Sequence, residues 1–202
     1  MDEKIFIDGG AHLFEGLQHF SELYNIDQSW SVVSFEANPD IYNSPTYRRN
    51  LKELQLKTNI SVFNKALGDS NKISKFIAPL SAQGSIMGSI DNYHQLHPDS
   101  CKTSEVEEIS LAGFIKNNFR KEDYIICKLD IEGAEFKVVK DLIDTNTIEY
   151  INDIYVEWHH DNTYGHQFPE TYSAQLQQQY LQSRQQLEQL SQEGKIKYTE
   201  WF

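Results

Sequence analysis

The chain has 202 residues, of which 39% are hydrophobic and 24% are charged, and its formal net charge is −12. This length and apolar content suit one globular domain, residues 1–202, with a sizeable core. The acidic balance argues against sequence-independent binding of nucleic acid and against docking on anionic membranes, because both need a basic surface.

The first predicted strand is the apolar run Lys4–Ile7, and the turn Asp8–Ala11 (DGGA) follows it. Apolar residues spaced by three and four then predict a helix over residues 13–24. Glycines let the backbone approach a ligand, and the start of a helix offers free N–H groups. Because Asp8 precedes the glycines, the turn suits a ligand with an ammonium group better than a pyrophosphate. The alternative is a tight turn that needs glycine only for its backbone dihedrals.

A second predicted strand, Trp30–Phe35, is followed by Glu36. An acid at this position of a Rossmann-type unit usually accepts hydrogen bonds from two ribose hydroxyls, so we expect Glu36 to bind a ribose. A solvated acid at the end of a strand is the alternative. After Pro45, a helix is predicted for Thr46–Leu54.

The third predicted strand is Ile60–Leu67, and a turn separates it from a further strand at Lys72–Ile77, which predicts a hairpin. The segment Ala78–Ser104 contains glycines, prolines and several serines and shows no periodicity. Loops of this length are usually functional lids or disordered. We expect this loop to lie over the carboxyl edge of the sheet and to shape the entry of a substrate.

After a short strand at Val106–Ile109 and a helix at Leu111–Phe119, the run Tyr124–Cys127 has the apolar character of a strand buried on both faces. It leads into residues 128–135 (KLDIEGAE), which concentrate charge where a helix begins. In open α/β sheets ligands bind at the carboxyl ends of the strands, so this segment is predicted to belong to a site. The alternative is that its residues only cap the helix.

A strand within Ile148–Val156 is followed by Glu157–Asp161 (EWHHD), and a long helix is predicted for Glu170–Glu193 before a last strand at Lys195–Phe202. The alternation of strands and helices predicts an α/β fold with a mostly parallel central sheet and helices on both faces. In such a sheet, acids that lie at the ends of different strands converge at one edge. These acids are Asp8, Glu36, Asp130 and Glu157.

The chain has two cysteines, Cys101 and Cys127, and Cys127 lies in an apolar strand, so a disulfide framework is not expected. No apolar run approaches the length of a membrane span, and no secretory signal pattern precedes Lys4. We expect a soluble cytoplasmic protein without membrane insertion.

Five segments resemble the FkbM-type methyltransferases, namely FIDGGAH, VSFEANPDIY, KALGDSN, CKLDIEGAEFKVVKDL and IYVEWHH. The resemblance covers most of the chain, from Ile5 to His160, and KLDIEGAE is its most specific part. It implies a class I, Rossmann-like enzyme that transfers a methyl group from S-adenosylmethionine to a hydroxyl. The family's acceptors suggest a sugar, a glycan or another small molecule as the partner.

The same resemblance implies which residues bind the cofactor. They are Asp8, Gly9, Gly10, Ala11, His12, Glu36, Ala37, Asn38, Ala66, Leu67 and Asp130. The glycine turn would face the methionine part, Glu36 the ribose, and the residues after the third strand the adenine. Two positions depart from the family, in which a glycine is often found at Phe14 and an asparagine is frequent at His12.

Methyl transfer to a hydroxyl requires aligned reactants and removal of a proton. The candidate catalytic residues are Asp130 and His159. A divalent metal held by Asp130, Glu132 and Glu157 is the other option, because a bound cation lowers the pKa of a hydroxyl. Carboxylates suit Mg2+, whereas a histidine ligand would favour a transition metal.

Two rival functions stay open at this point. A nicotinamide-dependent oxidoreductase can be built on a similar sheet, but the missing G-x-G-x-x-G and the acid before the glycines disfavour it. The other rival is a cofactor-binding or interaction protein that has kept the fold and lost the chemistry.

Overall fold

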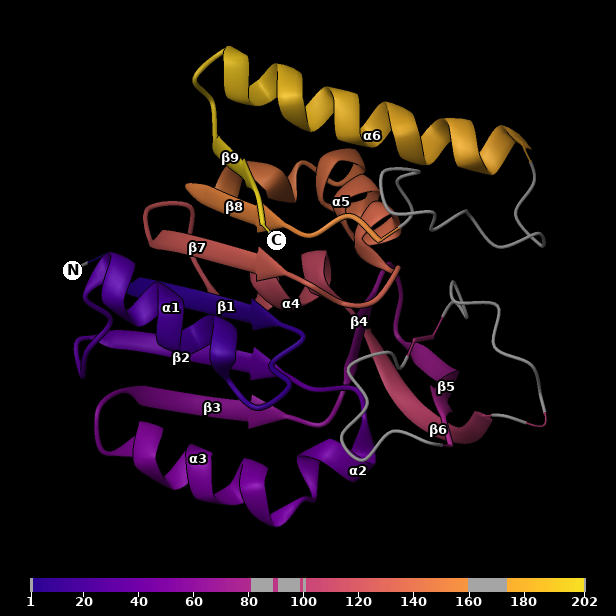
Figure 1. The fold of residues 1–202 in the computed structure, drawn as a ribbon. Coiled ribbons are helices and arrows are strands. Elements are labelled where there is room, and N and C mark those ends of the chain that lie inside the picture. The colour runs from indigo at the N-terminus through magenta and orange to yellow at the C-terminus, as the bar shows by residue number, and fades with distance from the viewer. Residues whose placement is uncertain (1, 81–88, 91–98, 100, 160–173, 202) are drawn as a thin grey trace.

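The computed structural model describes residues 2–80, 89–90, 99, 101–159 and 174–201. Its centre is a parallel sheet of six described strands (Figure 1). In spatial order these are β3 (Asn59–Phe63), β2 (Trp30–Phe35), β1 (Lys4–Gly9), β7 (Tyr124–Leu129), β8 (Asp153–Val156) and β9 (Lys197–Glu200). The predicted α/β class with a mostly parallel sheet is confirmed.

Helices cover both faces of this sheet. They are α1 (Glu15–Tyr24), α2 (Pro39–Tyr42), α3 (Pro45–Gln55), α4 (Leu111–Asn118), α5 (Glu135–Asp144) and α6 (Ala174–Gln192), with a 3-10 helix η2 (Thr147–Tyr150) before β8. Successive residues of a strand point to opposite faces. In β1, Ile5 and Ile7 therefore join one buried cluster, with α4, α5 and α6, while Phe6 joins a second, with α1 and α3.

A second, smaller sheet lies beyond the carboxyl ends of the central strands (Figure 1). Its strands are β4 (Ala66–Gly68), β6 (Cys101–Ser110) and β5 (Lys72–Pro79), in that order. The prediction of one strand at Ile60–Leu67 was wrong in part, because β3 ends at Phe63 and the chain then changes sheet.

The predicted hairpin between the third strand and Lys72–Ile77 was also wrong. The strand β5 pairs antiparallel with β6, about thirty residues later in the chain, and β6 is longer than the predicted Val106–Ile109. The physical reason is a small apolar core in which Phe76 of β5 packs with Val106 of β6 and Ala66 of β4. Burying these side chains stabilises the distant pairing more than a local turn would.

The predicted loop Ala78–Ser104 is shorter than expected, because its first and last residues belong to β5 and β6. Ser89 exchanges two backbone hydrogen bonds of 2.9 Å with Ile77. Most of the remaining loop, and with it the proposed lid, lies outside the described residues, as do His160 and Asp161. Within the part of the chain that is described, no helix is long and apolar enough to cross a membrane.

Candidate active site

The register of the sheet aligns the ends of its central strands. Gly9 pairs with Phe35 on one side and with Leu129 on the other, and Leu129 pairs in turn with Val156. The next residue of each strand therefore falls on the same edge. These residues are Gly10, Glu36, Asp130 and Glu157. The predicted convergence of acids from separate strands is confirmed for the last three.

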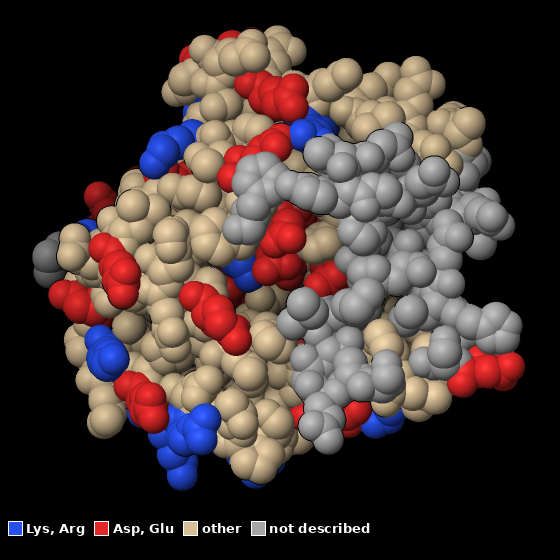
Figure 2. Space-filling view, viewed as in Figure 1, with Lys and Arg blue, Asp and Glu red and all other residues tan. Residues whose placement is uncertain are grey.

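A cavity of about 470 Å³ opens at this edge, within the usual size range for small-molecule sites. Figure 2 shows acidic side chains gathered near the centre of this face. The described residues that line the cavity come from the ends of the central strands and the segments that follow them, from the small sheet and its neighbouring loop, and from Trp201 after β9. They include Gly10, Ala11, His12, Glu15, Glu36, Ala37, Asn38, Ile41, Ala66, Leu67, Phe76, Ile90, Lys128, Asp130, Glu132, Glu157 and Trp201.

Glu36 is fixed at the wall of the cavity by the backbone. Its two carboxylate oxygens accept hydrogen bonds of 2.7 Å from the N–H groups of His12 and Asn38. Burial raises the pKa of Glu36 to about 7, although these two hydrogen bonds act in the opposite direction. The carboxylate is thus held in one orientation before any ligand arrives.

The loop that follows β1 has an unusual backbone. Gly10 has a φ of +80°, and a Cβ at this position would lie 1.7 Å from the carbonyl oxygen of Asp130, so only glycine fits. His12 and Phe14 also have positive φ values, 42° and 73°. These are the two positions at which the resemblance described above leads to the expectation of asparagine and glycine, the residues that tolerate left-handed backbone best.

Phe14 adopts this strained conformation while its ring is completely buried. The ring centroid lies 4.6 Å from that of Tyr47 in α3. Packing between α1 and α3 therefore compensates for the backbone strain at Phe14, which explains how a bulky residue can occupy a glycine-like position.

Asp8 and Gly9 do not line the cavity, although both were expected to bind the cofactor. Asp8 is completely buried beneath the loop, where Ser34 donates a hydrogen bond of 3.3 Å to its carboxylate. The ammonium group that Asp8 meets belongs to Lys128, 3.5 Å away. Burial raises the pKa of Asp8, and Lys128 opposes this shift. The structure thus places Asp8 as a support for Lys128.

Lys128 is the site residue that sequence reasoning missed. Its buried Nζ donates a hydrogen bond of 2.7 Å to the carbonyl oxygen of Gly10 and lies 3.1 Å from Oδ2 of Asp130. The signal for it was present, because Asp8 and Lys128 are each the second-last residue of a buried strand and pair in register. Buried charges in adjacent strands need one another as partners.

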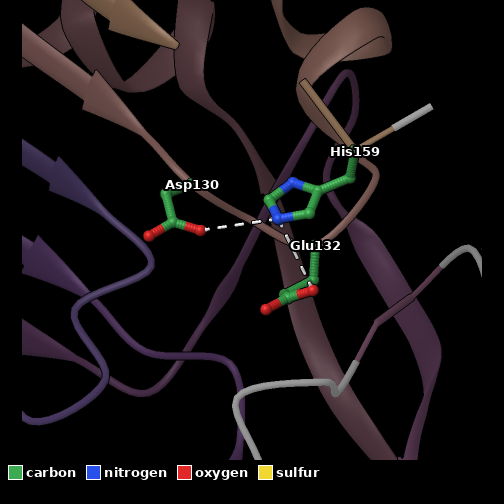
Figure 3. A group of neighbouring side chains, drawn as sticks. All are labelled: Asp130, Glu132 and His159. Atoms are coloured by element: carbon green, nitrogen blue, oxygen red, sulfur yellow. Dashed lines mark ion pairs between the residues drawn. The ribbon is translucent and has the colours of Figure 1, made fainter. Parts of the chain in front are cut away.

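A second polar group lies where β7 and β8 end (Figure 3). Donor atoms of Asp130, Glu132 and His159 all lie within 4.8 Å of one another, close enough to bind one metal ion. The Nε2 atom of His159 is 3.8 Å from Asp130, 3.7 Å from Glu132 and 3.6 Å from Glu157. Glu157 is equally close to His159 but is not a member of the group of three described residues whose donor atoms are mutually close. His159, and not Glu157, therefore lies with the two acids predicted as ligands.

Glu135, the first residue of α5, contacts this group from the protein interior through His159. It is completely buried, and its carboxylate accepts hydrogen bonds from the N–H groups of Ile131 and Gly133 and pairs with Nδ1 of His159 at 2.8 Å. Burial would lower the pKa of His159, but the surrounding carboxylates, Glu135 above all, raise it to about 10. Burial and the charge of Asp130 raise the pKa of Glu157 to about 7.

Residues 8–189 match the Methyltransferase FkbM domain family. Among solved structures, the crystal structure of Methyltransferase FkbM from Methylobacillus flagellatus KT matches with 14% sequence identity and a TM-score of 0.44. The match covers 73% of this chain and 30% of the solved chain, so this chain spans less than a third of the length of the protein it matches. No curated protein matches the chain.

Proposed function

Because the chain belongs to the FkbM methyltransferase family, we propose that it is an S-adenosylmethionine-dependent O-methyltransferase for a hydroxyl of a sugar, a glycan or another small molecule. The observation that carries the proposal is the fixed carboxylate of Glu36 at the wall of the cavity. Two backbone N–H groups hold both of its oxygens in place, which prepares it to accept hydrogen bonds from vicinal ribose hydroxyls.

The residues that line the cavity suit the parts of S-adenosylmethionine. Ala66 and Leu67, with Phe76 beside them, form an apolar wall suited to an adenine ring. The loop of Gly10, with Ala11 and His12, also lines the cavity and offers backbone polar groups, as do Ala37 and Asn38 near Glu36. The acidic side chains along the lining favour a cationic ligand. When bound, the cofactor supplies a methyl group on a positively charged sulfur.

Asp130 is the best placed proton acceptor for the acceptor hydroxyl. It follows β7, lines the cavity and is partly exposed, and Lys128 orients its carboxylate from the buried side. His159 suits this role less well, because a pKa of about 10 leaves its ring protonated at neutral pH. We therefore assign proton removal to Asp130 and treat His159 as its charged neighbour when no metal is present.

A metal-assisted route is the second form of the proposal. A divalent cation such as Mg2+ beside the acceptor would lower the pKa of its hydroxyl, and the predicted ligands were Asp130, Glu132 and Glu157. Asp130 and Glu132 lie close to each other and to a third potential ligand, His159, so the residues present fit a divalent ion. In this route the ion would replace the proton on the neighbouring imidazole.

The experiment that tests the proposal is ligand binding followed by turnover. S-adenosylhomocysteine should raise the melting temperature of the protein and bind in a calorimetric titration, because a ligand that binds only the folded state stabilises it. NAD and NADP should do neither. Methyl transfer is then sought with a panel of sugars, glycans and small hydroxylated molecules. Stabilisation by NAD in place of S-adenosylhomocysteine would favour the oxidoreductase, and cofactor binding without turnover would favour the non-catalytic protein.

A further inference from the structure

The cluster at the ends of β7 and β8 has mixed nitrogen and oxygen donors. Asp130 and Glu132 follow β7, while His159 follows β8, and each contributes one donor atom to the group (Figure 3). The Nε2 atom of His159 lies 3.8 Å and 3.7 Å from carboxylate oxygens of these two acids. These separations are too long for direct hydrogen bonds. They are close to the spacing of two atoms bound to the same cation.

Glu135 fixes the direction in which His159 points. Its carboxylate is completely buried and is held by the backbone N–H groups of Ile131 and Gly133, so it cannot follow the ring. Because it pairs with Nδ1 of His159 at 2.8 Å, the other ring nitrogen is directed toward Asp130 and Glu132. A carboxylate behind a histidine is the usual outer partner of a metal-binding imidazole.

We infer that Asp130, Glu132 and His159 bind a divalent first-row transition metal ion, and that Glu135 is the residue that positions His159 as its ligand. The inference concerns the metal-assisted form of the proposed function, but binding of the ion can be measured without it. It changes the predicted ligand set, because an imidazole takes the place of Glu157.

The donor set determines which ion fits best. Mg2+ prefers oxygen ligands and water, whereas an imidazole ligand favours ions from Mn2+ to Zn2+. Two carboxylates and one imidazole leave further coordination positions open for water or for a hydroxyl of the acceptor. The site should therefore bind Mn2+ and Co2+ more tightly than Mg2+, with Co2+ above Mn2+ in the usual order of affinities.

The test uses the full chain freed of metal with a chelator and titrated calorimetrically with MnCl2, CoCl2 and MgCl2. The visible absorption of bound Co2+ gives an independent signature of a nitrogen ligand. The variant His159→Asn removes Nε2, while its amide nitrogen can still donate to Glu135. The variant Glu135→Gln keeps the size of the side chain and removes its charge, and Glu157→Gln tests the set predicted from sequence.

Glu108 offers a matched control for the loss of a buried acid. It is also buried, but it pairs with Lys72 and Lys137 in and beside the small sheet and does not line the cavity. Glu108→Gln should lower the melting temperature without changing metal affinity. Glu135→Gln should reduce Mn2+ and Co2+ affinity by about 10–100-fold, the usual effect of losing an outer partner. His159→Asn should reduce it at least as much and change the Co2+ spectrum.

Three outcomes would overturn the inference. The first is a wild-type protein that binds none of the three ions. The second is unchanged Co2+ affinity and spectrum in His159→Asn, above all if Glu157→Gln loses binding instead. The third is a Glu135→Gln variant that loses stability but keeps full metal affinity, since that would make Glu135 purely structural. S-adenosylhomocysteine binding, measured on the same samples, reports separately whether the proposed cofactor site is correct.

Discussion

Lys128 places its ammonium group 3.1 Å from Oδ2 of Asp130, while Oδ1 of the same carboxylate faces the ring of His159. One oxygen of Asp130 is therefore held from the interior of the sheet, and the other is presented toward the cavity. Lys128 also donates to the carbonyl oxygen of Gly10. One buried cation thus connects the loop after β1 to the acid after β7, so the two halves of the site are positioned together.

The first prediction concerns the charge of Asp130. The change Asp130→Asn keeps the shape of the side chain, so S-adenosylhomocysteine affinity should change little. Methyl transfer should fall by about 10²-fold or more, the range for a positioned proton acceptor. Asp144→Asn, which removes an exposed acid of α5, is the control. Near-normal turnover in a folded Asp130→Asn protein would remove Asp130 from the mechanism and turn attention to Glu132 and Glu157.

The second prediction concerns the buried pair of Asp8 and Lys128. Lys128→Met should lower the free energy of unfolding by about 3–5 kcal/mol, because the completely buried Asp8 loses its counter-charge. Adding Asp8→Asn to this variant should restore much of the loss. Urea unfolding of the wild type, of Lys128→Met, of Asp8→Asn and of the double variant measures the coupling free energy between the two side chains. Additive effects of the two substitutions would show that the pair does not act as a unit.

The third prediction concerns stability and the proton of Glu36. The folded protein holds this proton more tightly than the unfolded chain, because its pKa rises from 4.5 to about 7. The stability that comes from it is complete below about pH 4.5 and is lost as the pH rises to 7. Compared with Glu36→Gln, the wild type should therefore lose about 3 kcal/mol across this range. Parallel stability curves for the two proteins, measured by urea unfolding, would contradict the assignment.

The fourth prediction concerns cofactor affinity and the same carboxylate. Ribose hydroxyls donate to an ionised carboxylate, so S-adenosylhomocysteine should bind the ionised form of Glu36. The pKa of Glu36 is about 7, so the affinity of the protein for S-adenosylhomocysteine should fall by about tenfold for each pH unit below this value. Glu36→Gln should bind more weakly near pH 8 and lack this dependence. Calorimetric titrations at several pH values check both, and an equally steep fall in the variant would assign the dependence to another group.

The fifth prediction concerns the strained residue Phe14. Removing its ring should destabilise the protein by about 3–5 kcal/mol, because the ring is completely buried against Tyr47. Since φ is 73°, Phe14→Gly should be more stable than Phe14→Ala by about 1 kcal/mol. Phe20, buried within the helix α1, is the control, and there alanine should be the more stable replacement. If alanine were the more stable replacement at position 14 as well as at position 20, backbone strain at Phe14 would be negligible.

The sequence by itself determined the class of fold and the edge at which the site lies. Strand and helix periods are local, because they follow from residues two to four positions apart. The sequence runs of β1, β2 and β7 were therefore recognised as strands. The acids that directly follow β2 and β7, Glu36 and Asp130, were recognised as candidate site residues. Once strands are parallel, geometry alone brings their carboxyl ends to one edge.

Only the tertiary structure decided which side chains meet. The partner of Asp8 is Lys128, and the partner of β5 is β6, both distant in sequence. Likewise, Glu135 and His159 pair although they are 24 positions apart, in the two charged segments that follow β7 and β8. The sequence showed both segments but not that these two side chains meet. Such choices depend on burial, since a charge or an apolar ring removed from water must find a partner wherever the chain provides one. Local patterns carry no record of which distant residue that is.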